Sequence, residues 1–429
     1  MRKHLIKRTV STAATLILAL MMTASLSAGT FTYADTEDEA SGETTEAVTT
    51  EEADADAEAP LVAKARKAAA DGLAAKQAAD QEAAKKNVKN PLTGLGDYNA
   101  DAVGKRPLAV VVENDPKARP QWGIDDPEKS PDIIVEGEME GGETRTLWFW
   151  ADMTALPSQV GPTRSARPPY IRFSELFDAI FVHCGLSHSS SDYVGADAVF
   201  EQDGVDHINM LTYGERGMFG RDYSRTSMLE HTAYVDGSKV MDTINEFGFR
   251  LDLKEGGATT FSFIGEEPEE EPAIGEGLAA QYRYSCGLVA FPPAPEEPAG
   301  VPCTSLDLSF SSITPTKHWE YSESDKMYHT QDYYTDVART NILILYDTTQ
   351  YVVRANTWGS NPETYTDYLY EGGSGKLAHD GRIEEITWKV EGGKLVLTDA
   401  NGETAKLAPG KTWIAFSSSN HGGWDKASE

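Results

Sequence analysis

A stretch rich in proline and glutamate, residues 263–302, divides this chain of 429 residues into two parts with different hydrophobic patterns. Before the stretch, short apolar runs alternate with segments of helix length. After it, short β-type runs follow one another between turn signals. Alternating strands and helices are typical of mixed α/β domains, whereas closely spaced strands with glycine turns indicate a β-rich unit. The stretch itself is interpreted as an interdomain linker or a surface insertion.

The first part, residues 90–262, predicts an α/β or α+β domain. The apolar runs Leu108–Glu113, Thr146–Trp150 and Ala179–His183 predict buried strands. A helix is expected to open at Pro168, because proline is favoured at the first helical position. Further helices are expected over Ser190–Phe200 and Ser238–Phe247.

The second part, residues 303–418, predicts a smaller and mostly-β domain, followed by a tail at 419–429. Asp380-Gly381 and Gly392-Gly393 are turn signals between its short apolar runs. The expected strands are Asn341–Tyr346, Arg382–Val390, Lys394–Thr398 and Thr412–Phe416.

The N-terminus has the pattern of a signal peptide, residues 1–34. A basic start precedes an apolar run and a small-residue site that predicts cleavage near Ala34. Residues 35–89 predict a spacer, whose acidic first part, 35–58, is expected to be disordered and whose remainder is rich in alanine and lysine. No later stretch is apolar enough to span a bilayer, so no stable membrane span is expected in the mature protein.

The positions of the cysteines bear on lipid attachment and on disulfide formation. Lipid attachment needs a cysteine directly after the cleavage site, and the first cysteine is Cys184. We therefore expect an extracellular or envelope-associated protein that is not a lipoprotein. Cys286 and Cys303 could form a disulfide, which would stabilise the fold by roughly 3 kcal/mol.

The acidic composition argues against several classes of partner. The formal net charge is −30 at pH 7, and nucleic acids or anionic membrane surfaces require a basic face. No C-x-x-C pair, H-E-x-x-H motif, EF-hand loop or Walker A motif occurs. The sequence therefore predicts no metal, no cofactor and no nucleic-acid partner.

A block between Lys117 and Arg172 concentrates glycine, arginine and glutamate and predicts a polar cleft. Arg164 and Arg167 are three residues apart, which suits two oxygens of a carboxylate or phosphate. Ion pairing of such arginines with neighbouring glutamates is the structural alternative. No catalytic residue is assigned. The candidate ligand-binding residues are Arg119, Glu136, Glu140, Arg145, Arg164, Arg167, His183, Arg221 and His231.

Short motifs spread over both parts carry a family resemblance. They are Asn90–Leu95, Arg106–Val110, Ala118–Gly123, Asp132–Glu136, Glu140–Arg145, Gly161–Arg167, Val182-His183, Arg221-Asp222, His231, Asn341–Ile344, Gly375–Gly381, Ile386–Trp388 and Pro409–Ile414. Together they resemble the YerB-like family of bacterial extracytoplasmic proteins, known mainly as lipoproteins with a domain of unknown function. The resemblance implies a two-domain envelope protein and brings no established reaction or substrate.

Three hypotheses for function stay open. The first is an exported cell-envelope protein that binds an anionic or polyhydroxylated cell-wall or envelope component in the Arg/Glu/His cleft. The absence of nucleophile and metal motifs and the long spacer favour it. The second is a hydrolase of an envelope polymer that uses a carboxylate and His183. The third is a surface scaffold whose arginines are purely structural.

Overall fold

The described part of the chain lies within one unit. The chain divides between Asp71 and Gly72, and every described residue belongs to the second unit. The predicted signal peptide, nearly all of the spacer and most of the linker therefore lie outside the described residues. The computed structural model describes residues 88–96, 98–265, 300–354, 363–420 and 424–428.

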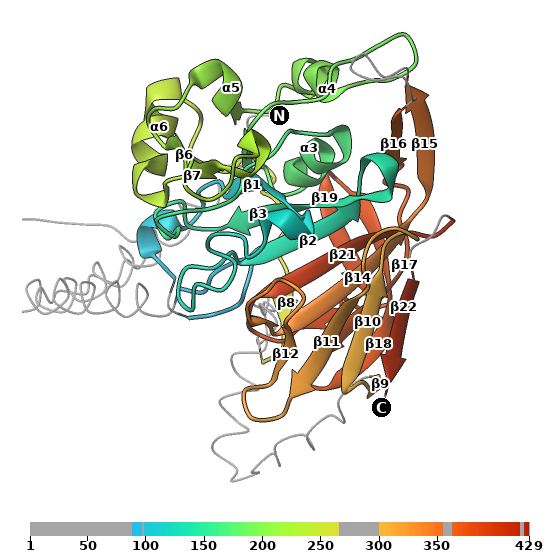
Figure 1. Ribbon diagram of the computed structural model, residues 1–429. Helices are drawn as coiled ribbons and strands as arrows, with labels where there is room; N and C mark the ends of the chain where they lie inside the picture. The colour runs from blue at the N-terminus through green and yellow to red at the C-terminus, as the bar shows by residue number, and fades with distance from the viewer. Residues whose placement is uncertain (1–87, 97, 266–299, 355–362, 421–423, 429) are drawn as a thin grey trace, which may run out of the picture. The chain divides into compact units, whose positions relative to one another are not determined.

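The largest sheet has eleven strands and contains strands of both parts (Figure 1). Its order is β19-β18-β17-β14-β21-β2-β3-β1-β4-β5, with β9 paired to β18. The strands from the first part are β1 (Leu108–Glu113), β2 (Ile133–Glu138), β3 (Thr144–Trp150), β4 (Ile180–His183) and β5 (His207–Asn209). Those from the second part are β9 (Val301–Pro302), β14 (Asn341–Asp347), β17 (Gly373–His379), β18 (Arg382–Glu391), β19 (Lys394–Thr398) and β21 (Thr412–Ser418).

The pairing of β2 with β21 joins the two parts. These strands are parallel, and Ile134 lies opposite Trp413 in their register. Alternate residues of the sheet face two apolar cores, and each core contains residues from both parts. One core includes Val111 and Ile414, and the other includes Val110 and Trp413. The two parts are thus continuous through one sheet.

Strand directions bring many strand ends to one edge of this sheet. β1, β4 and β5 are parallel to one another, as are β2, β21 and β14. β3 is antiparallel to both β1 and β2, so the two parallel groups run in the same direction. Carboxyl ends of parallel strands are common ligand positions in α/β folds. The residues at this carboxyl edge are Asn209, His183, Glu113, Glu138, Ser418 and Asp347.

Helices and short strands of the first part pack against the sheet. Two prolines start α3, whose Phe173 ring lies 6.5 Å from the Phe149 ring of β3. The α-helices are α3 (Pro168–Glu175), α4 (Ala196–Asp203), α5 (Met210–Tyr213) and α6 (Val240–Phe247). The 3-10 helices are η1 (Ala100–Ala102), η2 (Pro116–Ala118), η3 (Glu140–Gly142), η4 (Leu229–His231) and η5 (Gly237–Lys239), and the short strands are β6 (Phe219–Arg221), β7 (Ala233–Val235) and β8 (Ser262–Phe263).

The second part adds a five-stranded antiparallel sheet and a separate hairpin. The sheet has the order β13-β12-β11-β10-β22, the hairpin consists of β15 and β16, and β20 pairs with β8. These strands are β10 (Ser305–Ser309), β11 (Lys317–Ser322), β12 (Met327–Thr330), β13 (Val337–Arg339), β15 (Thr349–Arg354), β16 (Glu363–Tyr368), β20 (Lys406–Leu407) and β22 (Trp424–Ser428).

The predicted fold class is confirmed: the first part mixes helices and strands, and the second part is mostly strands. One predicted helix starts later than expected, because α4 begins at Ala196 rather than at Ser190. The Asp197 carboxylate accepts hydrogen bonds from the backbone N–H and hydroxyl of Ser189 at 2.9 and 2.6 Å. These side-chain bonds hold the preceding segment as a loop.

Two sequence predictions concern residues that the structure describes only in part. The Cys303 side chain is buried, and its sulfur lies 3.4 Å from the Ser305 carbonyl oxygen. Its predicted disulfide partner, Cys286, lies outside the described residues, so the bridge stays a prediction. Within the described ranges, no helix is long and apolar enough to cross a membrane.

Candidate functional site

Glu140 brings two of the predicted arginines together beside the carboxyl edge of the sheet. Arg167 donates from Nε to Glu140 Oε2 at 3.1 Å and also binds this carboxylate through Nη2. Arg145 Nη2 lies 3.6 Å from Glu140 Oε1, while Arg145 Nη1 donates to the Ser165 carbonyl oxygen at 2.9 Å. Burial alone would raise the pKa of Glu140, but the two guanidiniums outweigh it and hold the pKa at about 2.

A second ion-pair group lies at the end of β1. Glu113 is buried and faces Arg145 in the β1–β3 register. Its carboxylate pairs with Arg164 Nε and lies 3.8 Å from His231 Nδ1. Glu113 was not among the candidate residues, although a glutamate that ends the apolar run of β1 was a usable signal. The paired carboxylates therefore engage Arg145, Arg164 and Arg167.

Glu136 forms a buried polar layer between the two parts of the chain. Its side chain is fully buried and accepts hydrogen bonds from Asn114 Nδ2 at 2.7 Å and Thr144 Oγ1 at 2.8 Å. The Tyr333 hydroxyl donates to its other oxygen at 3.2 Å. Glu136 thus fixes the Asn114 amide and the Thr144 hydroxyl, and it is not exposed to a ligand.

Arg119 and Arg221 bond mainly to backbone carbonyl groups. Arg119 donates to the Asp332 carbonyl oxygen at 2.6 Å and to the Asn114 carbonyl oxygen at 3.0 Å. Arg221 donates to the Leu229 carbonyl oxygen at 2.7 Å, and its Nε lies 3.4 Å from Glu215. Both guanidiniums hold loops in place.

His183 does not join the arginines. Its ring is fully buried and stacks at 5.1 Å on the Phe200 ring of α4. Nδ1 donates to the Gly185 carbonyl oxygen at 2.6 Å, and Nε2 lies 2.9 Å from His207 Nδ1. Burial lowers the pKa of His183 to about 3, so this imidazole is neutral near pH 7. It is a structural side chain, as lone histidines at strand ends often are.

A pocket of about 240 Å³ lies over the Glu136 layer and is lined by both parts of the chain. Asn114 and Thr144 line it above Glu136, and the exposed Glu143 carboxylate stands beside it. Burial raises the pKa of Glu143, and the charges of Asp115, Glu113 and Glu140 raise it further. We name this cavity the edge pocket. Its lining residues are Asn114, Asp115, Pro116, Arg119, Glu143, Thr144, Ile313, Thr314 and Pro315.

Hydrogen bonds join the wall of the edge pocket that comes from the second part to the first part. The Ser311 and Thr314 hydroxyls donate to the Gly142 carbonyl oxygen at 2.5 and 2.6 Å. These bonds hold Ile313 and Pro315 opposite η2. The edge pocket therefore exists only when both parts are folded together. Among the described residues, no group of three or more histidine, cysteine or acidic side chains is arranged to hold a metal ion.

Comparison with protein families decides the relationship that the motifs indicated. Residues 92–250 match the N-terminal domain of the protein of unknown function DUF3048. Residues 306–414 match the C-terminal domain of the same family. The chain belongs to the DUF3048 family. Its two-domain organisation is thereby confirmed, and the edge pocket of this DUF3048 protein is lined by residues of both matched regions.

Two similar proteins extend this assignment. The Bacillus subtilis (strain 168) protein named "Putative lipoprotein YerB" is 28% identical over 339 residues, which are 77% of this chain and 86% of that protein. The crystal structure of the YerB protein from Bacillus subtilis matches with a TM-score of 0.56 at 24% identity. It covers 79% of this chain and 99% of that chain, and the likeness concerns the fold.

The prediction that this DUF3048 protein is not a lipoprotein is wrong. It rested on the absence of a cysteine before Cys184. The similar Bacillus subtilis protein carries the name of a lipoprotein, so relatives of this chain are assigned to that class. Lipid attachment depends on a few residues at the processing site, which lie outside the described residues.

Of the candidate residues selected from the sequence, Arg119 lines the edge pocket. Glu136 bonds to the lining residues Asn114 and Thr144. Glu143 was not among the candidates, although it follows the Gly141-Gly142 turn and lies within the selected block. Ile313 and Pro315 carried no signal, because only tertiary contact brings them to the first part.

Proposed function

We propose that this DUF3048 protein is an exported cell-envelope protein that binds a polyhydroxylated envelope component, such as a wall sugar, in the edge pocket. The observation that carries the proposal is the exposed Glu143 carboxylate, which has no hydrogen-bond partner among the described residues, beside the apolar Ile313 and Pro315. Carboxylates accept hydrogen bonds from hydroxyl groups, and apolar walls cover the carbon faces of a sugar. The volume suits a small group such as one sugar ring.

The arginine contacts argue against an anionic ligand. Arg145 and Arg167 both bind Glu140, and Arg164 binds Glu113. A phosphate or carboxylate would have to displace one of these carboxylates, which would leave a buried charge without a partner. Such unpairing costs several kcal/mol. A neutral ligand that bonds to carboxylate oxygens meets no such cost.

The surroundings of His183 argue against the hydrolase hypothesis. A general acid or base must reach the substrate and exchange a proton near the working pH. His183 is fully buried, and its pKa is lowered to about 3. Binding is therefore better supported than acid–base hydrolysis with this histidine.

Glu143→Ala should weaken retention of the protein on purified peptidoglycan by about tenfold or more, because a hydrogen bond to a charged group is lost. The side chain is exposed, so the variant should keep the unfolding midpoint of the wild type. Glu320→Ala is the matched control, since Glu320 is an exposed glutamate on β11 outside the edge pocket. Equal retention of Glu143→Ala and wild type would reject the proposal. Released sugar fragments would favour the hydrolase.

A further inference from the structure

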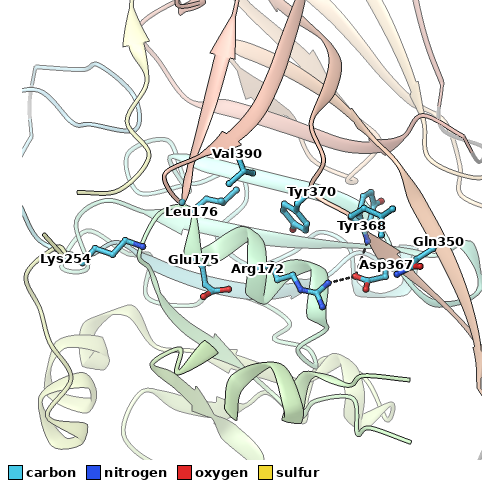
Figure 2. A pocket seen from close by; sticks show the side chains of 11 residues that line it. Arg172, Glu175, Leu176, Lys254, Gln350, Asp367, Tyr368, Tyr370 and Val390 are labelled. Atoms are coloured by element: carbon cyan, nitrogen blue, oxygen red, sulfur yellow. Dashed lines mark hydrogen bonds and ion pairs between the residues drawn. The ribbon is translucent and has the colours of Figure 1, made fainter. Parts of the chain in front are cut away.

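A second and larger cavity lies beside α3 (Figure 2). Its volume is about 490 Å³, which is within the usual range of small-molecule sites. The first part contributes Arg172 and Glu175 from α3 and also Lys254. The second part contributes Asp367 of β16 and residues next to it. We name this cavity the α3 pocket.

Four charged side chains line the α3 pocket, two cationic and two acidic. In Figure 2, Glu175 lies between Lys254 and Arg172, and Arg172 points toward Asp367. Arg172 Nη1 donates to Asp367 Oδ1 at 2.7 Å. The Arg172 and Asp367 side chains are still 32% and 21% exposed, so this pair is accessible from the cavity.

Lys254 and Glu175 are the charged side chains of this pocket that lack a hydrogen-bond or ion-pair partner among the described residues. Lys254 is exposed, and its ammonium has no hydrogen-bond or ion-pair partner among the described residues. The half-buried Glu175 carboxylate likewise accepts no hydrogen bond within these residues. Lys254 and Glu175 carry opposite charges on one side of the pocket and form no ion pair with each other. They are therefore complementary to a ligand that carries both charges.

The Glu175 carboxyl is also in an unfavourable environment for its charged form. Burial raises its pKa to about 7, and Asp203 adds to this effect, whereas Lys254 and Arg172 oppose it. The folded state thus binds the Glu175 proton more tightly than the unfolded state, so wild-type stability falls as the pH rises from about 4.5 to 7. Glu175→Gln removes this loss. In urea denaturation, the midpoint of Glu175→Gln relative to that of the wild type should therefore rise between pH 5 and about pH 8. A difference in midpoint that stays constant with pH would contradict the assignment.

We propose that the α3 pocket binds a small zwitterion of the amino-acid or dipeptide type. Its carboxylate would pair with the ammonium of Lys254. Its ammonium would pair with Glu175 on the same wall. This site is separate from the edge pocket, since the two cavities share no lining residue. Binding of a zwitterion in the α3 pocket does not depend on sugar binding in the edge pocket.

Calorimetric titration with the dipeptide alanyl-alanine tests the proposal. We expect saturable binding by the full chain, and at least about tenfold weaker binding by Lys254→Met, which loses a charge-assisted contact. Lys406→Met is the matched control, because Lys406 is an exposed lysine on β20 outside the pocket. Glu175→Gln should weaken binding of the same dipeptide.

Blocked dipeptides separate a zwitterion site from a general one. N-acetyl-alanyl-alanine lacks the ammonium and alanyl-alanine amide lacks the carboxylate, so each should bind at least about tenfold more weakly than the parent dipeptide. Three results would overturn the proposal: no saturable heat with alanyl-alanine, equal affinity of the wild type and Lys254→Met, or equal affinity for the parent and both blocked dipeptides. Glu143→Ala should bind alanyl-alanine with the affinity of the wild type. This result would keep the test of the α3 pocket distinct from the test of the edge pocket.

Discussion

Glu140→Gln is expected to lower the free energy of unfolding by about 3–5 kcal/mol near neutral pH, because it leaves buried guanidiniums without their carboxylate. The Arg145 and Arg167 side chains are only 6% and 11% exposed, and both bind Glu140. Glutamine keeps the shape of the side chain and removes its charge. Since the Glu140 side chain is 24% exposed, solvent screening places the effect at the lower end of that range.

The pH dependence of the same variant follows from the lowered pKa of Glu140. The folded-state pKa is about 2, below the ordinary value of 4.5, so the carboxylate stabilises the fold above pH 4.5. This contribution is lost as the pH falls through about 2. The difference between wild type and Glu140→Gln in urea denaturation should therefore be largest at neutral pH and shrink in acid.

An exposed carboxylate supplies the control for this experiment. Glu323 pairs with Lys326, and its side chain is 78% exposed. Glu323→Gln should leave the unfolding free energy unchanged, because exposed ion pairs contribute little. A Glu140→Gln variant as stable as Glu323→Gln at pH 7 would show that the arginines are not held by this carboxylate.

Trp413→Ala should cost about 3–5 kcal/mol of stability, the usual loss when a fully buried large aromatic side chain is truncated. Trp413 lies on β21 between β2 and β14 and is fully buried. Its ring centroid is 5.3 Å from that of Trp319 and 5.2 Å from that of Tyr333. The substitution opens a cavity at the strand that joins the two parts.

The unfolding curve of Trp413→Ala also reports on the shared sheet. Because β21 pairs with strands of both parts, they should lose structure in one transition, with coincident midpoints by circular dichroism and tryptophan fluorescence. Val301→Ala, which truncates a side chain that is 61% exposed, should leave the midpoint unchanged. Two separated transitions in Trp413→Ala would mean that the parts fold independently.

Local patterns predicted most strands and helices but could not predict how the two parts meet. Apolar runs such as Leu108–Glu113 became strands, because a buried strand needs only a short apolar sequence. The parallel pairing of β2 with β21 joins residues far apart in the chain. Neither segment alone indicates its pairing partner, so the sequence predicted the two domains but not the sheet that runs through both.

The site was predictable to the extent that its residues are close in sequence. Arg145, Arg164 and Arg167 lie in one block, and two of them meet Glu140 from the same block. The pattern of charges alone could not decide whether an arginine guanidinium binds a ligand or a neighbouring carboxylate. In the structure these arginines bind the carboxylates of Glu140 and Glu113. His183 was selected for its strand end, but strand alternation turns it toward Phe200 of α4.

The most direct test of ligand binding in the edge pocket is calorimetric titration of the full chain with a soluble, uncharged peptidoglycan glycan fragment at two salt concentrations. We predict saturable binding whose affinity changes little with salt concentration, because the ligand is neutral. Glu143→Ala should weaken this affinity by about tenfold or more. Absence of binding to this fragment, together with salt-sensitive binding to a phosphate polymer that Glu143→Ala leaves intact, would contradict the account.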